Sequence, residues 1–423
     1  MTRRLLQMFL FIVASMTIII ILVSPISIFS GKDAKAVRKT VALQTIAPQR
    51  LFISAWRNIK TLYADPTMNN QDWRKWKYRY LKHIKTNEDV AVAINTMLAS
   101  LNDEYSQFYD KKKYILQEKY IKDNSDKNYS KLVLKILNIK SSAKISLTTT
   151  AGMVQSAVVT ENSKDFSEPK ENDKIISINN YQLKGMEMNS AISLIRGKSN
   201  ISKVTILRNN VLKTLSLVQG SMMVEKISSK LLDDNIAYIS IYSLMGENAL
   251  RDFVRAIKKY PDAKGYIIDL RGDVGGLFLN AVYIADEIIE DGQIVTIEYR
   301  DGRQYTMNAE LPADEYTKPI VVLVNNKTAS SSEILAGALQ SNKKALLVGE
   351  ETYGKNAIQQ IIPLPNNTCI NLTTAYYKFK NGKDFKQGKL IPDYVVKMSK
   401  KDILTGNDKQ LKKAIAVINS LTK

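Results

Sequence analysis

The sequence contains a single cysteine and a single histidine, and these two scarcities exclude several kinds of site. With Cys369 alone, no disulfide can form within the chain. A zinc centre built from several His and Cys ligands is excluded in the same way. A Ser-His-Asp triad would need His83, which stands among charged residues in Lys82-His83-Ile84-Lys85 and reads as an exposed helix residue. Nothing in the sequence calls for a metal ion or a cofactor.

Acidic residues are also outnumbered, since 61 lysines and arginines oppose 41 aspartates and glutamates for a formal net charge of +20. Such a charge is typical of proteins that bind nucleic acid, anionic membranes or acidic substrates. The lysines are spread along the whole chain, however, and form no arginine-rich tract with interleaved aromatic residues. The charge therefore indicates a solvated surface that is compatible with anionic lipid, and no nucleic-acid partner is expected.

Long apolar runs are absent except at the N-terminus. Met1-Thr2-Arg3-Arg4 is positive, and the 20 residues from Leu5 to Ser24 are largely apolar. A helix of that length rises about 30 Å, enough to cross the hydrocarbon core. The basic flank predicts that the remainder is exported. We expect residues 1–30 to be a transmembrane anchor that holds the rest of the chain on the periplasmic side of the inner membrane. The alternative is a signal segment cleaved near Ala34-Lys35-Ala36.

A chain of 423 residues is too long for one ordinary core, and its patterns predict several domains. Residues 37–115 read as a helical domain, because apolar residues recur there at helical spacing. Residues 130–220 read as a β-rich module with a hairpin turn at Asn209-Asn210. Residues 225–400 alternate strands and helices, which indicates an α/β core, and residues 401–423 read as a C-terminal helix. The expected fold class is therefore multidomain, with α+β and α/β parts.

One candidate for chemistry lies where the strand Ile320 to Val324 gives way to a small-residue turn and then to a helix beginning at Ser332. Such a turn presents Ser330 at the C-terminal edge of a sheet, beside free amides and the positive end of a helix dipole. A serine there can act as a nucleophile if a base is near, and the amides can stabilise an oxyanion. The plainer alternative is that Ser330-x-x-Glu333 is only a helix capping box.

Lys355 is the candidate base, in the loop that follows the strand Leu346 to Val348. A lysine can replace histidine only when it is neutral, so burial must lower its pKa from about 10.4 to roughly 7–8. Gln359 returns to the same face four residues later, in a helix or in a strand. A neutral amide at this position can orient the amine without restoring its charge.

The same loop can be compared with a phosphate-binding loop, since Gly349-x4-Gly354-Lys355 matches that motif up to its last position. Asn356 replaces the required Ser or Thr, and two glutamates inside the loop would repel phosphate. The sequence after the loop looks extended, so no helix N-terminus faces it. These features argue against phosphate binding.

A glycine-rich turn, Asp269-Leu270-Arg271-Gly272-Asp273-Val274-Gly275-Gly276, follows another buried strand. Its glycines would let backbone amides approach a substrate oxygen closely. An ordinary strand–helix turn would account for one glycine more easily than for three.

Together these segments resemble the C-terminal processing peptidases, also called tail-specific proteases. The family's Thr-Ala-Ser-x-Ser-Glu and Gly-Glu-x-Thr-aromatic-Gly-Lys segments match Ser330 and Lys355, whose separation (355 − 330 = 25) fits as well. The resemblance implies that Gln359 belongs to the catalytic group and that the amides of Gly276 and Ser330 form the oxyanion hole. It also implies a crotonase-like protease core. Asp269 and Arg271 are expected to be structural rather than catalytic.

The resemblance covers the other domains too. The helical segment from Ala55 through Phe108 resembles the N-terminal region of plant and cyanobacterial members, and residues 173–207 resemble the family's PDZ domain. The PDZ carboxylate-binding loop is not recognisable between Tyr129 and Gly152, so this domain is expected to be degenerate. Ser331, Asn356 and Asp273-Val274 depart from the family pattern without removing a catalytic group.

The expected activity is that of a serine endopeptidase acting on proteins with accessible, apolar C-terminal tails. The tail would be captured in extended form by strand addition. Neutral Lys355 would take the proton of Ser330, which forms an acyl-enzyme that water then hydrolyses. The alternative is a catalytically inactive PDZ scaffold or binding protein at the membrane surface.

Overall fold

The computed structural model describes residues 47–423 apart from 115–142, 151–152, 162–168, 187, 197–200, 219–221, 247, 311–315 and 381–388. The predicted anchor at residues 1–30 and the alternative cleavage site lie outside the described residues, as does most of the sequence just before the β-rich module. Within the described part of the chain, no helix combines the length and the apolar character needed to cross a membrane.

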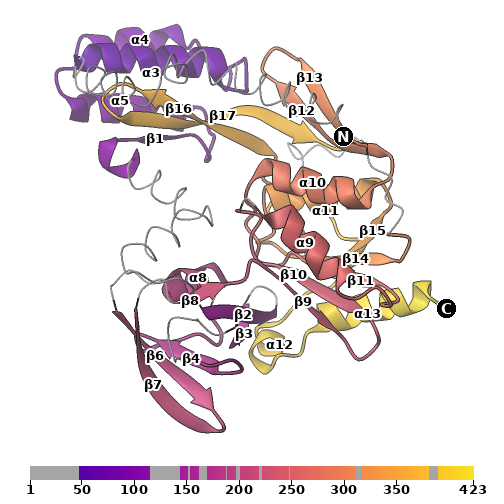
Figure 1. The fold of residues 1–423 in the computed structure, drawn as a ribbon. Helices are drawn as coiled ribbons and strands as arrows, with labels where there is room; N and C mark the ends of the chain where they lie inside the picture. Colours follow the sequence, from indigo (N-terminus) through magenta and orange to yellow (C-terminus); the bar gives the residue numbers. More distant parts are fainter. Residues whose placement is uncertain are drawn as a thin grey trace, which may run out of the picture.

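The N-terminal helices do not form a core of their own. They pack on the long hairpin of a five-stranded antiparallel sheet, and Figure 1 shows this hairpin running from the helices toward the rest of the molecule. Buried residues of the helices, such as Phe52 and Met97, share one cluster with Ile362 and Ile370 of the hairpin. The helices are α3 (Pro48–Leu62), α4 (Arg74–Leu81) and α5 (Asn87–Ser100); the strands are β1 (Gln107–Tyr109), β12 (Gly292–Tyr299), β13 (Gln304–Ala309), β16 (Ala357–Leu364) and β17 (Thr368–Lys378).

A six-stranded sheet forms the α/β core, and its neighbouring strands are parallel except for the edge strand β9. Alternate residues of the central strands face opposite sides, so Ile268 packs under the helices of one face and Ile267 packs against α13 on the other. The strands lie in the order β18 (Tyr394–Val395), β15 (Ala345–Gly349), β14 (Ile320–Val324), β11 (Tyr266–Asp269), β10 (Ala237–Ile241) and β9 (Ile227–Leu231).

Helices α9 (Ala249–Lys258), α10 (Phe278–Ile288) and α11 (Ser331–Ser341) cover one face of this sheet, and α10 and α11 also contact the five-stranded sheet. The C-terminal stretch, expected as one helix, forms α12 (Lys400–Thr405) and α13 (Lys409–Leu421). Gly406, with φ of 72°, ends α12 and lets the chain turn into α13.

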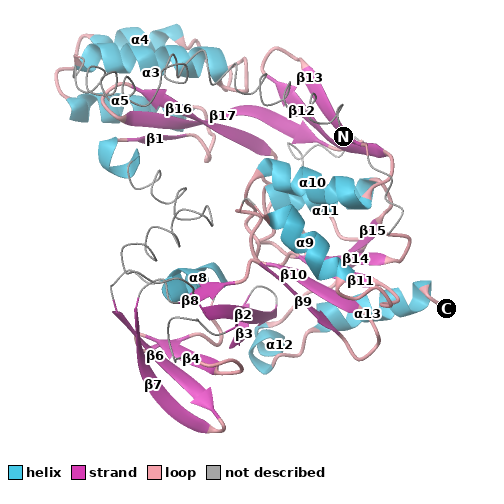
Figure 2. Cartoon of the chain, in the orientation of Figure 1, coloured by secondary structure: helices cyan, strands magenta, loops and turns pink. Residues whose placement is uncertain are grey.

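The β-rich module has its own core and lies apart from the N-terminal helices (Figure 2). The turn at Asn209-Asn210 joins β6 and β7 as the sequence predicts, and both asparagines have positive φ, as such hairpin turns require. Gln155 of the module donates to the carbonyl of Ile403 in α12 at 3.1 Å. The module comprises β2 (Ala143–Thr150), β3 (Met153–Glu161), β4 (Lys174–Ile178), β5 (Tyr181–Gln182), α8 (Met188–Arg196), β6 (Ile201–Arg208), β7 (Val211–Val218) and β8 (Met222–Val224).

Candidate active site

Ser330 lies between the end of β14 and the first residue of α11. Its φ of 58° and ψ of −124° are unusual for a residue with a side chain and cost about 1–3 kcal/mol. Hydrogen bonds hold the turn in place: the Thr328 hydroxyl donates to the carbonyl of Leu270 at 2.9 Å, and the Ala329 amide donates to the carbonyl of Asp273 at 3.1 Å. The turn that presents Ser330 is therefore tied to the glycine-rich turn after β11.

Lys355 lies in the loop between β15 and β16, and it is half-buried. Burial lowers the pKa of its ammonium below the ordinary value, because the charged form loses water. The carboxylates of Asp103, Glu333 and Glu104 oppose this shift. The Lys355 Nζ lies 5.0 Å from the centre of the Tyr105 ring, which forms part of the wall that shields it.

The buried carboxylate of Glu333 connects the two candidate residues. Its Oε2 accepts hydrogen bonds from the amides of Ser330 and Lys355, each at 2.9 Å. Its Oε1 accepts from the amide of Gly354 at 2.7 Å and from the hydroxyl of Thr352 at 2.6 Å. Burial raises the pKa of Glu333, although these four donors favour its charged form. One side chain thus fixes the Ser330 turn against the Lys355 loop.

Tyr377 of β17 reinforces this junction. Its hydroxyl lies 2.7 Å from the carbonyl oxygen of Lys355 and 3.3 Å from that of Ser330. Burial raises the pKa of Tyr377 well above its ordinary value, so the phenol stays protonated and can donate.

The glycine-rich turn packs directly against Ser330. A Cβ atom on Gly275, whose φ is 99°, would lie 2.7 Å from the Ala329 carbonyl oxygen and 3.1 Å from the Ser330 Cβ. A Cβ on Gly276 would lie 2.1 Å from the carbonyl carbon of Leu244. Only glycine fits at either position: Gly275 lets the backbone of this turn lie close to the candidate nucleophile, and Gly276 lets it lie close to Leu244.

The two amides that the sequence assigns to an oxyanion hole differ in their surroundings. Among the residues that the structure describes, the Gly276 amide has no hydrogen-bond acceptor, whereas the neighbouring Leu277 amide donates to Leu244. The Ser330 amide donates to Glu333 and is not free. The site therefore offers one amide without an acceptor, that of Gly276, and one amide that already donates to Glu333, that of Ser330.

Gln359 lies on β16, at a point where the pairing with β17 shifts register. Its side-chain amide donates to the Thr373 hydroxyl of β17 at 3.2 Å. This contact fixes the Gln359 side chain against the sheet that also carries the Lys355 loop.

Sequence reasoning missed the contribution of the loop after α5. Two residues of β17 bind this loop. The backbone amide of Thr373 donates to the Ser106 hydroxyl at 3.0 Å, and the side-chain amide of Asn371 donates to the carbonyl of Tyr105 at 3.1 Å. The Tyr353 hydroxyl lies 3.4 Å from a carboxylate oxygen of Glu104. No local pattern marks these contacts, because they join residues more than 200 positions apart.

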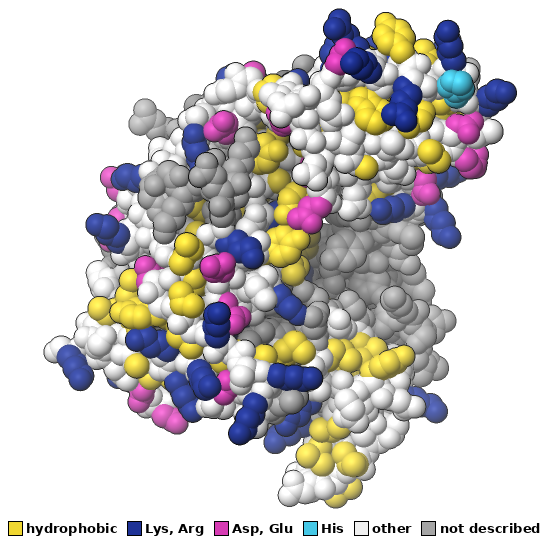
Figure 3. Space-filling model, turned by 180° about the vertical axis from the view of Figure 1, so that it is seen from behind, with side chains coloured by type: hydrophobic (Ala, Val, Ile, Leu, Met, Phe, Trp, Pro, Cys, Tyr) yellow, Lys and Arg dark blue, Asp and Glu magenta, His cyan; other side chains and the backbone are white. Residues whose placement is uncertain are grey.

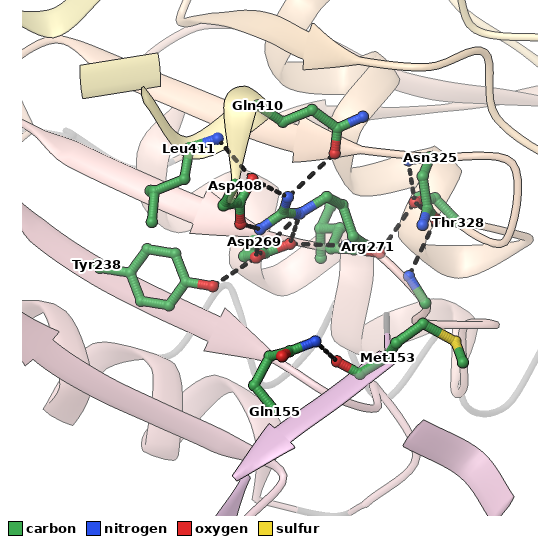
Figure 4. A network of polar contacts seen from close by, with 12 residues as sticks. Met153, Gln155, Tyr238, Asp269, Arg271, Asn325, Thr328, Asp408, Gln410 and Leu411 are labelled. Carbon is green, nitrogen blue, oxygen red and sulfur yellow. Dashed lines mark hydrogen bonds and ion pairs between the residues drawn. The ribbon is translucent and has the colours of Figure 1, made fainter. Parts of the chain in front are cut away.

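Asp269 and Arg271 lie in a buried network that joins the glycine-rich turn to α13 (Figure 4). The Arg271 guanidinium contacts Asp269 at 2.6 Å, Asp408 at 2.8 Å and the side-chain oxygen of Gln410 at 3.0 Å. Tyr238 donates to Asp269 from the neighbouring strand. All five side chains are engaged with one another, which agrees with the structural role expected for Asp269 and Arg271.

Charged and potential metal-binding side chains elsewhere on the described part of the chain are the other features that could mark a site. Lysines and arginines are scattered over the face seen in Figure 3 rather than gathered in one patch. Over the described ranges, no three or more His, Cys, Asp or Glu residues are grouped so that they could hold a metal ion.

Comparison with known proteins finds matches to peptidase family models. Residues 235–396 match the model of Peptidase family S41, and residues 47–99 match that of the Tricorn protease C1 domain. A carboxyl-terminal-processing protease of Synechocystis sp. is 29% identical over 367 residues, which cover 84% of this chain and 82% of that protein. The carboxy-terminal processing protease CtpA of Bacillus subtilis is 33% identical over 312 residues, 71% of this chain and 62% of that protein.

Among solved structures, the photosystem II D1 C-terminal processing protease has the same fold, with a TM-score of 0.54 and 24% identity over 83% of this chain and 93% of that one. The mixed α/β fold with its matched core is that of a serine-type peptidase. Within that class, the core of the chain matches Peptidase family S41, and the chain is similar to carboxyl-terminal-processing proteases over most of its length.

Proposed function

We propose that this chain is an extracytoplasmic endopeptidase that cleaves proteins near their C-termini, with Ser330 as nucleophile and Lys355 as general base. The observation that carries the proposal is the shared carboxylate of Glu333, which binds the amides of both residues. A serine in a strained turn and a lysine with a lowered pKa are thereby held on one support. Both features are what nucleophilic catalysis by a serine–lysine pair requires.

In the first step, the neutral Lys355 amine takes the hydroxyl proton of Ser330 while Oγ bonds to the substrate carbonyl carbon. The carbonyl electrons move onto the oxygen, which becomes an oxyanion. The open amide of Gly276 donates to that oxygen, and the Ser330 amide divides its donation between the oxyanion and Glu333. Each such donor is worth about 3–4 kcal/mol in comparable acyl-transfer sites.

In the second step, the carbon–nitrogen bond breaks and the Lys355 ammonium returns its proton to the departing amine. Water then attacks the acyl-enzyme, Lys355 takes a proton from the water, and Ser330 leaves with a proton restored. Gln359, fixed on Thr373, supplies a neutral amide four residues from the base, which supports its orientation without favouring its charged form.

Apolar side chains beside the site favour an apolar substrate tail. Val274 on the glycine-rich turn is 56% exposed, Leu277 directly after that turn is 44% exposed, and Tyr353 on the Lys355 loop is 45% exposed. Single exposed apolar residues are common on protein surfaces, but these three lie together on the segments around Ser330. We propose that they receive the extended C-terminal tail of a protein substrate, added as a strand.

The β-rich module between residues 143 and 224 is proposed to be the degenerate PDZ-like domain of the chain. Its support is a sheet whose neighbouring strands are antiparallel except for the pair β2 and β8, with α8 between β5 and β6 in the chain. Titration of the full chain with tail peptides, with and without the terminal carboxylate, tests it. Equal binding of both forms would contradict tail capture by a PDZ-like mode.

Export and membrane attachment rest on the N-terminal sequence, where two arginines precede 20 largely apolar residues. The proposal expects the chain in the membrane fraction of cells and open to added protease from the exterior side of that membrane. Recovery of the chain from the cytosolic fraction would contradict it.

A tail-peptide cleavage assay on the purified full chain tests the proposed chemistry. Ser330→Ala and Lys355→Ala should each lower kcat/KM by about 10³-fold or more. The matched controls Ser54→Ala and Lys401→Ala should cleave like the parent. Cleavage by all variants at the parent rate would favour the binding-protein alternative, and a loss of stability without loss of rate would reduce Ser330 to a helix cap.

A further inference from the structure

Asp273 is a fully buried carboxyl group within the glycine-rich turn, and the mechanism above makes no use of it. Its Oδ1 accepts a hydrogen bond from the Gly275 amide at 2.9 Å, while its backbone carbonyl accepts one from Ala329 at 3.1 Å. Among the described residues, its Oδ2 has no hydrogen-bond partner. The residue therefore holds the turn that carries Gly276 against the turn that carries Ser330.

Among the described residues, no positive charge compensates this carboxyl group. Arg271, two residues away, directs its guanidinium to Asp269 and Asp408. The Lys355 Nζ lies over the ring of Tyr105 and is not among the groups that shift the pKa of Asp273. Of the elements packed on the turn, α11 contributes one titratable residue, Glu333. Its carboxylate accepts four hydrogen bonds from Ser330 and the Lys355 loop and none from Asp273.

The uncharged neighbours do not stabilise an anion strongly either. The Ser332 hydroxyl of α11 lies near enough to favour the charged form but makes no well-formed hydrogen bond with it. The Gly275 amide is the one donor in good geometry. Burial dominates and raises the pKa of Asp273 to about 7.

We propose that Asp273 works as a neutral carboxyl group, a positioning residue that holds the oxyanion-binding turn, and that its ionisation shuts the site at alkaline pH. The inference rests on the proposed function, since it assumes that Gly276 serves the oxyanion. In the neutral form, Oδ1 accepts from Gly275 and the Oδ2 proton is available to the Ser332 hydroxyl. In the ionised form, a negative charge lies in the same turn as the developing oxyanion and opposes it.

The consequence is an active form in which Lys355 is deprotonated while Asp273 is protonated. Activity then falls on the acid side as Lys355 gains a proton and on the alkaline side as Asp273 loses one, which gives a bell-shaped profile. The profile is a readout that a purely structural carboxyl group would not produce.

The test compares kcat/KM from pH 5 to 9.5 for the full chain and for Asp273→Asn, with Asp262→Asn as control. Asparagine keeps the shape and the acceptor of a neutral aspartic acid, adds a donor toward Ser332, and cannot ionise. Asp262 is an exposed aspartate that undergoes the same chemical change. We expect Asp273→Asn to stay within about threefold of the parent at pH 6 and to lose the alkaline limb, which Asp262→Asn retains.

A second measurement does not depend on peptidase activity. A raised pKa means that the unfolded chain ionises at lower pH than the folded chain, so stability is lost as pH rises from about 4 through about 7. Denaturant unfolding should therefore show Asp273→Asn gaining stability over the parent between pH 5 and pH 8, with no such gain in Asp262→Asn.

The outcomes separate this inference from the proposed function. A parent profile without loss of activity from pH 6 to 9 overturns the role of Asp273, and so does an alkaline limb that persists in Asp273→Asn or a folded Asp273→Asn that is inactive at every pH. If Ser330→Ala abolishes cleavage while these results are found, the inference alone has failed. If Ser330→Ala still cleaves, the proposed function has failed, whatever the unfolding experiment gives.

Discussion

The Nζ of Lys355 lies 5.0 Å from the ring centre of Tyr105, a residue that precedes it by 250 positions (355 − 105). The ring belongs to the loop after α5, which is bound to β17 through Ser106. The N-terminal helical region thus supplies part of the wall around the proposed base. Since burial is the main cause of the lowered pKa of Lys355, the wall is expected to govern its protonation.

Replacing Tyr105 with alanine should admit water to Lys355 and raise its pKa toward the ordinary value. The base is then protonated over more of the pH range, so the acid limb of kcat/KM moves to higher pH. Tyr105→Phe keeps the ring and should keep the limb in place. The exposed Tyr78 provides the control Tyr78→Ala, and an acid limb that is unchanged in Tyr105→Ala would show that the ring does not shield the base.

Local sequence patterns predict much of the fold, but they cannot predict which distant segments pack together. The alternation that predicts the parallel sheet follows from short apolar strands such as β14, and the position of Ser330 follows from the strand–turn–helix pattern. The domain boundaries stay predictions. That α3 and α5 share a core with β16 and β17 depends on contacts between distant segments, which no spacing rule encodes.

The same limit applies to the site. Ser-x-x-Glu spacing identifies Glu333 as a helix-capping residue, but the three donors of the Lys355 loop come from a segment about 20 residues later that only the fold brings there. The roles of Ser330, Lys355, Gln359 and Gly276 stay predictions, which the experiments here address.

Glu333→Gln should separate the two candidate residues without removing either. The neutral amide retains one acceptor oxygen for four donors and places an NH₂ group near other donors. Misplacement of Ser330 relative to Lys355 by about 1 Å is expected to lower kcat by about 10²-fold. Glu171→Gln, at an exposed position of the β-rich module, should match the parent; equal kcat in both variants would contradict the proposed junction.

Gly276→Ala tests the close approach of the glycine-rich turn. The added Cβ would lie 2.1 Å from the Leu244 carbonyl carbon, so the turn must move and its amide must leave the site. We expect a loss of kcat of at least about 10²-fold, the effect of removing an oxyanion donor. Gly302→Ala is the control: its Cβ meets open space, and although its φ of 79° makes the exchange strained, that strain lies in an exposed turn outside the proposed site. A fully active Gly276→Ala would remove this amide from the mechanism.

Arg271→Ala should act on stability. It leaves the buried carboxylates Asp269 and Asp408 without their shared cation, which is expected to cost about 3–5 kcal/mol in the free energy of unfolding. The exposed ion pair of Arg303 with Asp301 gives the control Arg303→Ala, expected to change stability by less than about 1 kcal/mol. Denaturant unfolding measures both, and similar values for the two variants would contradict a supporting role for the buried network.

Covalent trapping tests the central claim most directly. A fluorophosphonate linked to an apolar tail peptide is incubated with the parent chain and with Lys355→Ala, and the modified residue is located by mass spectrometry of the digested protein. The proposed serine–lysine pair predicts one adduct on Ser330 in the parent and labelling at least about 10²-fold slower in Lys355→Ala, because the base that activates the hydroxyl is gone. An adduct on another residue, or equal labelling of Ser330 in both proteins, would contradict it.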